Sequence, residues 1–230
     1  ALNYSSIRKL LPYAKKAIES GVKVIKLNIG DPDLKTPKEF LNVLQNWDID
    51  PIRYAQPAGE PELIKALLSY YHDCGYTDLS AEDIIVTIGG SEALSMAMFA
   101  VADIGDEILV PELFFANYSI LASQLSIKLV PIPTSIKNGF RLPNKKKIMG
   151  LINERTKAVL YSSPGNPTGT TYNEKEITML LEIAKEKGIY LISDEVYREF
   201  IFSDDKHVSL VPYMNKYPNN LIMLDSFSKR

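Results

Sequence analysis

The chain has 230 residues, of which 46% are hydrophobic, and it carries 26 basic against 28 acidic side chains. A chain of this length and apolar content can bury a substantial core, which excludes an intrinsically disordered protein. The near balance of charge gives no field that favours nucleic acid or an anionic membrane, so small molecules are the expected ligands.

Cysteine and histidine are scarce. Cys74 is the single cysteine, which excludes an intramolecular disulfide, and with only His72 and His207 we expect no metal site. A reducing, cytoplasmic setting fits this composition. The first 21 residues carry charges throughout and lack the apolar run of a signal peptide or membrane span, so we expect no targeting or membrane segment.

The first fifty residues show helical patterns and one short extended stretch, residues 24–29, without alternation of strands and helices. Thr36, Pro37 and Glu39 offer a cap, a first-turn proline and a reciprocal glutamate, which predicts a helix towards Trp47. We interpret residues 1–50 as an N-terminal arm and part of a small domain, and residues 51–230 as a large domain.

From about residue 83 onwards, β-rich runs alternate with helical patterns, which is typical of an α/β protein with a parallel sheet covered by helices. A further helix should begin at Pro61 and reach about Tyr71. The expected strands are Ile84–Ile88, Glu107–Val110, Lys128–Pro131, Ala158–Ser162, Tyr190–Ser193 and Leu221–Leu224. The expected helices between them are Ser91–Val101, Ala116–Leu125, Lys145–Ile152 and Glu174–Lys187.

The helix 174–187 has the clearest end signals. Asn173 and Glu176 have the spacing of a capping box, and Gly188 is suited to the position after the last turn. In an open α/β sheet, ligands bind beyond the carboxyl ends of the strands, so the residues that follow each strand are the first candidates for a site.

Small residues follow the first expected strand. Gly89, Gly90, Ser91 and Glu92 bring free backbone N–H groups to a helix N-terminus, a typical seat for a phosphate. The third glycine of a dinucleotide fingerprint and the Gly-Lys-Ser/Thr of a P-loop are both missing. A tight strand-to-helix turn that needs glycine for its geometry is the alternative.

The strand 158–162 leads into a stiff turn, SSPGNPTG. Its prolines and glycines leave Asn166 as the side chain best able to bind a ligand, with a rigid structural turn as the alternative.

Two charged residues end later strands. Asp194 loses hydration at the end of a buried strand and needs a cation or a hydrogen-bond donor to remain charged, and a protonated heterocyclic nitrogen of a ligand would serve. The alternative is that Asp194 caps the next helix. Lys229, after the last strand, must lose its proton before it can attack a carbonyl, and desolvation favours this; the alternative is a solvated charge.

Taken in series, the motifs LNIGDPD, RYAQPAGEPELIKAL, TIGGSEAL, SSPGNPTG, SDEVYREF and SFSK resemble those of class I and II aminotransferases. These are pyridoxal 5′-phosphate enzymes of fold type I, and the resemblance extends over the whole chain to the aspartate-aminotransferase-like branch. It implies that Lys229 anchors the cofactor covalently and then carries a proton. It also implies that Asp194 pairs with the pyridine nitrogen, and that Asn166 and Tyr197 hydrogen-bond the ring hydroxyl.

The resemblance assigns further contacts to the cofactor phosphate. Gly90 and Ser91 match the phosphate-binding turn through backbone and hydroxyl, and Glu92 matches it through its amide. Ser226, three residues before the lysine, matches a phosphate-binding serine, with Ser228 a weaker match.

The remaining assignments concern the ring face, the substrate and a second subunit. Phe115 is the best match for the aromatic residue that stacks on the ring, with Phe114 and Tyr118 as rivals, because the segment PELFFANYS departs from the commoner Tyr-Trp pair. Gly30 resembles the glycine that contacts the substrate carboxylate, a role that Asn166 shares. Tyr54 resembles a tyrosine that reaches the phosphate of the neighbouring subunit, which implies a homodimer.

The implied reaction is a ping-pong transfer of an amino group between an L-amino acid, with aspartate leading, and a 2-oxo acid such as 2-oxoglutarate. The same cofactor set also serves lyases and decarboxylases, and a non-catalytic, cofactor-sensing or truncated homologue is a further alternative. Chains of this family continue past the lysine and hold two arginines there, so we expect the 230 residues to be a fragment of a longer enzyme. Whether the fragment is active by itself is left open by the sequence.

Overall fold

The computed structural model describes residues 8–27, 30, 33–202 and 204–230. The described residues divide into two compact units, one up to residue 57 and the other from residue 58 to residue 230. The smaller unit holds a 3-10 turn, Arg8–Leu10, and the helices α1 (Leu11–Glu19) and α2 (Lys38–Gln45). The cap predicted at Thr36 is wrong. Pro37, with ψ 134°, occupies the N-cap position itself, which puts Thr36 outside the helix.

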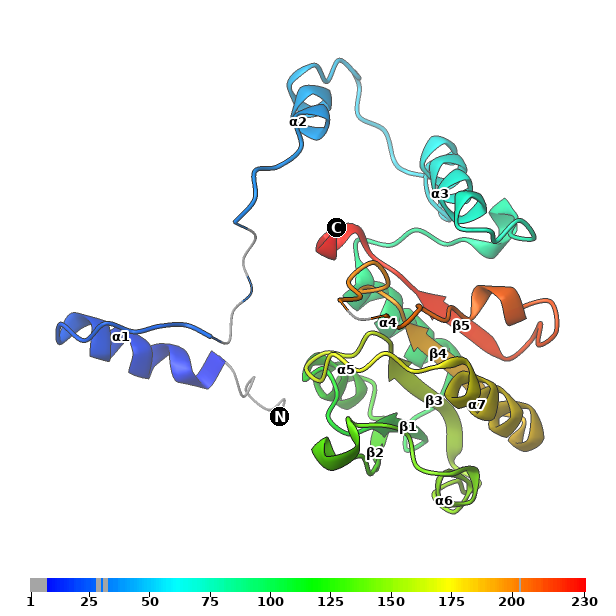
Figure 1. The fold of residues 1–230 in the computed structure, drawn as a ribbon. Helices are drawn as coiled ribbons and strands as arrows, with labels where there is room; N and C mark the ends of the chain where they lie inside the picture. The colour runs from blue at the N-terminus through cyan, green and yellow to red at the C-terminus, as the bar shows by residue number, and fades with distance from the viewer. Residues whose placement is uncertain (1–7, 28–29, 31–32, 203) are drawn as a thin grey trace. The chain divides into compact units, whose positions relative to one another are not determined.

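The larger unit is an α/β fold, as the sequence predicted (Figure 1). Its strands pair side by side in the order β2-β1-β3-β4-β5, all parallel. They are β1 (Glu107–Pro111), β2 (Lys128–Ile132), β3 (Thr156–Ser162), β4 (Tyr190–Asp194) and β5 (Leu221–Leu224). The helices are α3 (Pro61–Asp73), α4 (Gly90–Val101), α5 (Asn117–Gln124), α6 (Lys145–Met149) and α7 (Glu174–Lys187), with short 3-10 turns at Ala81–Asp83, Ile136–Asn138, Val211–Tyr213 and Phe227–Lys229.

The sheet has a hydrophobic core on each face (Figure 1). On one face, α6 and α7 pack Ile148 and Leu180 against Val159 and Tyr161 of β3. On the other face, α4 and α5 pack Met98 and Tyr118 against the sheet. Because alternate residues of a strand point to opposite faces and both faces are covered, the central strands β1, β3 and β4 are buried almost throughout.

The strand predicted at Ile84–Ile88 is wrong. The segment is extended at Ile84, with φ −117° and ψ 128°, yet it forms no ladder. Val86 N donates to Ala58 O at 2.8 Å, and Ile88 N donates to Glu92 Oε2 at 2.6 Å. A strand needs a neighbour to accept its hydrogen bonds, and in the described part of the chain no strand pairs with this segment.

The ends of α7 follow the prediction. Asn173 Oδ1 accepts from Glu176 N at 3.1 Å, and Glu176 Oε2 accepts from Asn173 N at 3.0 Å, which completes the capping box. Gly188 ends the helix in the left-handed conformation, with φ 65°. Helix α6 is shorter than predicted, because its cap Gly150 follows Met149 directly. None of the described helices is both long and apolar enough to cross a membrane.

Candidate active site at the carboxyl ends of the strands

Asp194, the last residue of β4, is the most deeply buried acid of the predicted site, with 8% of its surface exposed. Its Oδ2 accepts a hydrogen bond from the Tyr118 hydroxyl at 2.5 Å, and its Oδ1 accepts from Val196 N at 3.3 Å. Burial raises the pKa of Asp194, these two hydrogen bonds oppose the rise, and the nearby charges of Asp225 and Glu195 add to it.

No ion pair within the described residues includes Asp194. A carboxylate that is buried with two donors and no cation is suited to bind a cationic group on a ligand. Asp194 is not the N-cap of an α-helix, which was the alternative, because the residues after β4 form turns.

Asn166 and Tyr197 come together although 31 residues separate them, because β3 and β4 are neighbours that end at the same edge of the sheet. Asn166 Nδ2 donates to the Tyr197 hydroxyl at 3.5 Å, and both residues line a cavity of about 580 Å³. The Lys229 ammonium lies 5.8 Å from the centre of the Tyr197 ring. The structure therefore brings two predicted site residues, Asn166 and Lys229, to a third, Tyr197.

The turn before α4 has the features expected of an anion seat. Gly89 has φ +142°, a conformation that side chains with a Cβ rarely adopt, and it lets the chain turn directly into the helix. The amides of Gly90 and Ser91 make no hydrogen bond within the described part of the chain. The Glu92 amide donates to Gly89 O at 3.0 Å. It is therefore less available to bind an anion than the amides of Gly90 and Ser91.

The two predicted serines lie beside this turn. A Cβ on Gly90 would stand 3.5 Å from Ser226 Cβ, so the segment after β5 packs closely against the start of α4. The Ser226 and Ser228 hydroxyls are 2.9 Å apart, and Ser226 Oγ also accepts from Ser228 N at 3.1 Å. The free amides of the turn and the Ser226 hydroxyl are thus neighbours.

The three aromatic residues considered for stacking on a ligand ring differ in how deeply they are buried. Tyr118 is 1% exposed, with Phe114 stacked on it at 6.2 Å and Phe115 edge-on at 5.7 Å. Phe115 is 38% exposed and Phe114 is half-buried. Phe115 is therefore the one of the three with most surface to offer to a ligand ring, and the Tyr118 ring is enclosed.

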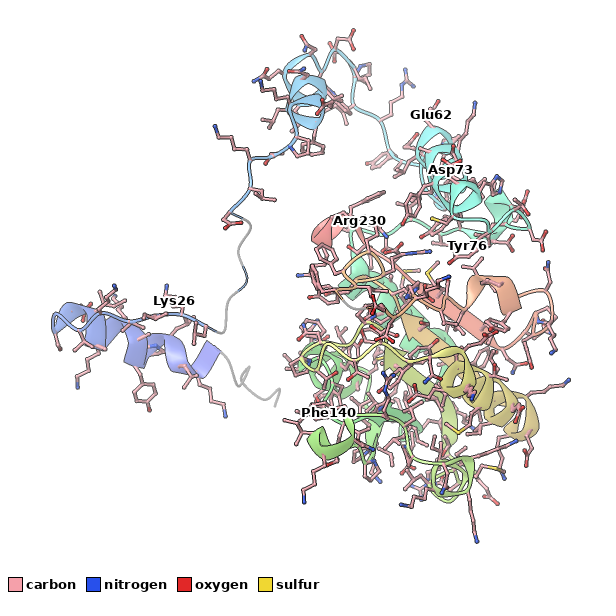
Figure 2. The ribbon with its side chains drawn as sticks, in the orientation of Figure 1. Lys26, Glu62, Asp73, Tyr76, Phe140 and Arg230 are labelled. Atoms are coloured by element: carbon pink, nitrogen blue, oxygen red, sulfur yellow. The ribbon has the colours of Figure 1, made fainter. Side chains whose placement is uncertain are left out.

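A cluster around Asp225 was not predicted. Asp225 accepts from the Tyr71 hydroxyl at 2.8 Å and from Arg230 Nη2 at 2.7 Å. The Arg198 guanidinium lies 5.3 Å from the Tyr71 and Tyr76 ring centres and 3.9 Å from Asp225. Of the residues in this cluster, Figure 2 labels Tyr76 and Arg230. These contacts tie α3 to the segment that carries Ser226 and Lys229. The position of Asp225 directly after β5 was the signal that could have drawn attention to it.

Gly30 and Tyr54 belong to the smaller unit, and their predicted roles stay predictions. Gly30 is exposed, and residues on both sides of it lie outside the described part of the chain. Tyr54 is fully exposed within its unit.

The larger unit is an α/β fold in which several of the candidate ligand-binding residues lie beyond the carboxyl ends of parallel strands. The sequence signature described as Aminotransferase class I and II matches residues 22–230. The chain therefore belongs to the class I and II aminotransferases, a family of pyridoxal-phosphate-dependent enzymes that act on amino acids and 2-oxo acids. The resemblance predicted from the motifs is confirmed.

Known relatives agree with this assignment. The aspartate aminotransferase of Pyrococcus horikoshii is 34% identical over 226 residues, which cover 98% of this chain and 56% of that protein. The solved aspartate aminotransferase from Rhizobium meliloti matches with a TM-score of 0.89 at 27% identity, over 100% of this chain and 57% of its own. The Thermus thermophilus aspartate aminotransferase solved with maleate matches with a TM-score of 0.86 at 28% identity, over 99% and 59%. The chain thus spans little more than half the length of these relatives.

Proposed function

We propose that this chain forms the cofactor-binding part of a pyridoxal 5′-phosphate-dependent aminotransferase. The observation that carries the proposal is Asp194, a buried carboxylate at a strand end that is held by two hydrogen-bond donors and lacks an ion-pair partner within the described residues. A protonated pyridine nitrogen is the kind of cation that such a carboxylate would stabilise.

The other residues fit the remaining parts of the cofactor. The free amides of Gly90 and Ser91, with the Ser226 hydroxyl beside them, suit a phosphate dianion, because the N-terminus of α4 adds a favourable dipole. Asn166 and Tyr197 would hydrogen-bond the ring hydroxyl. Phe115 would stack on the ring. Further contacts with the phosphate would come from Glu92, Ser228 and, from a neighbouring subunit, Tyr54.

When bound, pyridoxal 5′-phosphate supplies an electron sink that stabilises negative charge at the α-carbon of an amino acid. In its ionised form, Asp194 would pair with the ring nitrogen and favour the protonated state of that nitrogen. The Lys229 amine would anchor the cofactor and would be released from it by the amino group of the substrate. The free amine could then take the proton from the substrate α-carbon as a general base. The Lys229 ammonium lies 5.8 Å from the centre of the Tyr197 ring, so Tyr197 would help to position this amine.

We infer an amino-acid donor and a 2-oxo acid acceptor in a ping-pong cycle, with aspartate as the leading donor and 2-oxoglutarate as the acceptor. The support for aspartate comes from the relatives, which include aspartate aminotransferases, one of them solved with the dicarboxylate maleate. Gly30 would contact the substrate carboxylate, and Tyr54 would reach a second copy of the chain in a homodimer.

The test is an absorption titration of the purified chain with pyridoxal 5′-phosphate, followed by borohydride reduction and peptide mass spectrometry. We expect a visible band and a cofactor adduct on Lys229, both lost in Lys229→Ala and retained in Lys137→Ala, which removes an exposed lysine. Added aspartate should shift the band to that of the pyridoxamine form more effectively than alanine or phenylalanine. A band that survives in Lys229→Ala, or an adduct on another lysine, would contradict the proposal.

A further inference from the structure

Tyr118 contacts the predicted cofactor-binding carboxylate directly, although the sequence suggested it only as a rival for ring stacking. Its hydroxyl donates to Asp194 Oδ2 at 2.5 Å, whereas Val196 N, the other donor, lies 3.3 Å from Oδ1. The hydrogen bond joins α5 to the end of β4 across 76 residues of sequence. It is the shortest contact that Asp194 makes within the described chain.

The surroundings of Tyr118 fix the direction of its hydroxyl. The ring is 1% exposed, with Phe114 nearly parallel to it at an interplanar angle of 7° and Phe115 nearly perpendicular at 88°. A tyrosine packed in this way has little rotamer freedom, so its O–H points at one place. Burial, together with the charge of Asp194, raises the pKa of Tyr118 well above its usual value, so the hydroxyl remains a donor across the neutral range.

Other charged and titratable groups lie near Asp194, and most have partners of their own. These neighbours are Asp225, Glu195, Tyr197 and, through Tyr197, Lys229. Glu195 is bound by His207 at 2.7 Å and by Leu210 N at 2.9 Å. Asp225 is bound by Tyr71 and Arg230. Tyr118 is thus the side chain that satisfies Asp194 itself.

We propose that Tyr118 is a positioning residue that holds Asp194 ionised and aimed at a cationic ring nitrogen of the ligand. The inference rests on the proposed function, since it assigns to Asp194 a heterocyclic ligand. Without the hydroxyl, the carboxylate would keep one long hydrogen bond from Val196 N in a buried setting. Protonation of Asp194 would then be favoured, and a protonated acid no longer stabilises a cation.

The chain offers a matched control on the opposite face of the sheet. Tyr161 of β3 is also fully buried, near Ser193, and its ring belongs to the core under α6 and α7. Its hydroxyl makes no hydrogen bond of acceptable geometry with any described residue. Tyr118→Phe and Tyr161→Phe each delete one buried hydroxyl and keep the ring. The two variants differ in whether that hydroxyl contacts Asp194.

The first measurement needs no cofactor. Urea unfolding is followed at several pH values between 4 and 8 for the unsubstituted chain, Tyr118→Phe, Asp194→Asn and the double variant. We expect Tyr118→Phe to destabilise the chain increasingly as the pH rises and Asp194 ionises, and this pH dependence to vanish in the Asp194→Asn background. An identical pH dependence in both backgrounds would show that Tyr118 does not act through Asp194.

The second measurement is a spectroscopic titration with pyridoxal 5′-phosphate. We expect Tyr118→Phe to weaken binding by about tenfold, the size of effect typical of losing a hydrogen bond to a charged group. The loss should be greater at low pH. Tyr161→Phe should bind the cofactor like the unsubstituted chain. Equal binding by the two variants would overturn the role towards the ligand. If the unsubstituted chain forms no Lys229-dependent band, the proposed function fails, whereas the unfolding cycle still decides whether Tyr118 and Asp194 are coupled.

Discussion

Replacing Asp194 by asparagine should make the cofactor-free protein more stable at neutral pH while it weakens the ligand site. The substitution removes a buried charge and conserves the shape of the side chain. The amide can accept from Val196 N through its oxygen and donate to the Tyr118 hydroxyl through its nitrogen, so both present contacts have a replacement. The desolvation cost of the carboxylate is what disappears.

The pH dependence of this effect has a definite sign. Burial raises the pKa of Asp194 above its unfolded value of about 3.9. Protonation of Asp194 therefore contributes stability that is fully present below the unfolded pKa and is lost as the pH rises through the folded pKa. Each tenfold increase in the proton affinity of the folded state corresponds to about 1.4 kcal/mol. We expect the variant to gain on the order of 1 kcal/mol over the unsubstituted chain between pH 4 and pH 8.

The assay is urea unfolding of both proteins without cofactor across that pH range, with the exposed Asp73→Asn as a control for a general change of charge. Pyridoxal 5′-phosphate titration should show binding weakened by roughly thirtyfold or more, since removing one partner of a buried charge pair costs about 2 kcal/mol or more. A difference in unfolding free energy that does not change with pH, or one that favours the unsubstituted chain at pH 8, would refute the reasoning.

Two further predictions concern local structure, and urea unfolding tests both. Asn173→Ala removes the side-chain half of the α7 capping box and should cost about 1 kcal/mol, whereas the neighbouring Lys175→Ala should change the unfolding free energy little; equal effects would contradict the role of the cap. Gly89→Ala forces a Cβ onto a residue with φ +142° and should cost about 1 to 3 kcal/mol, whereas Gly150→Ala, with φ −68°, should be nearly neutral; a neutral Gly89→Ala would show that the turn before α4 can relax.

Much of the candidate site was predictable because the rule for parallel sheets needs only the positions of the strands. Asn166, Asp194 and Lys229 each follow an apolar run, and the structure brings the first and the last to Tyr197. The partner of Asp194 was not predictable in this way. Tyr118 lies on α5, and nothing in its local sequence distinguishes a stacking ring from a hydroxyl that donates to a carboxylate.

The sequence by itself determined the features that depend on neighbours along the chain. The bounds of α7 and its capping box follow from side chains within four residues of each other, and β5 follows from a short apolar run. Tertiary structure decided the features that need a distant partner. The sequence of residues 84–88 predicts a strand, but in the described part of the chain no strand pairs with it. Asp225 accepts its hydrogen bonds from Tyr71 and Arg230, which are distant from each other in the sequence. Hydrogen bonds of buried groups must be satisfied wherever a partner lies, and only the packed chain specifies where that is.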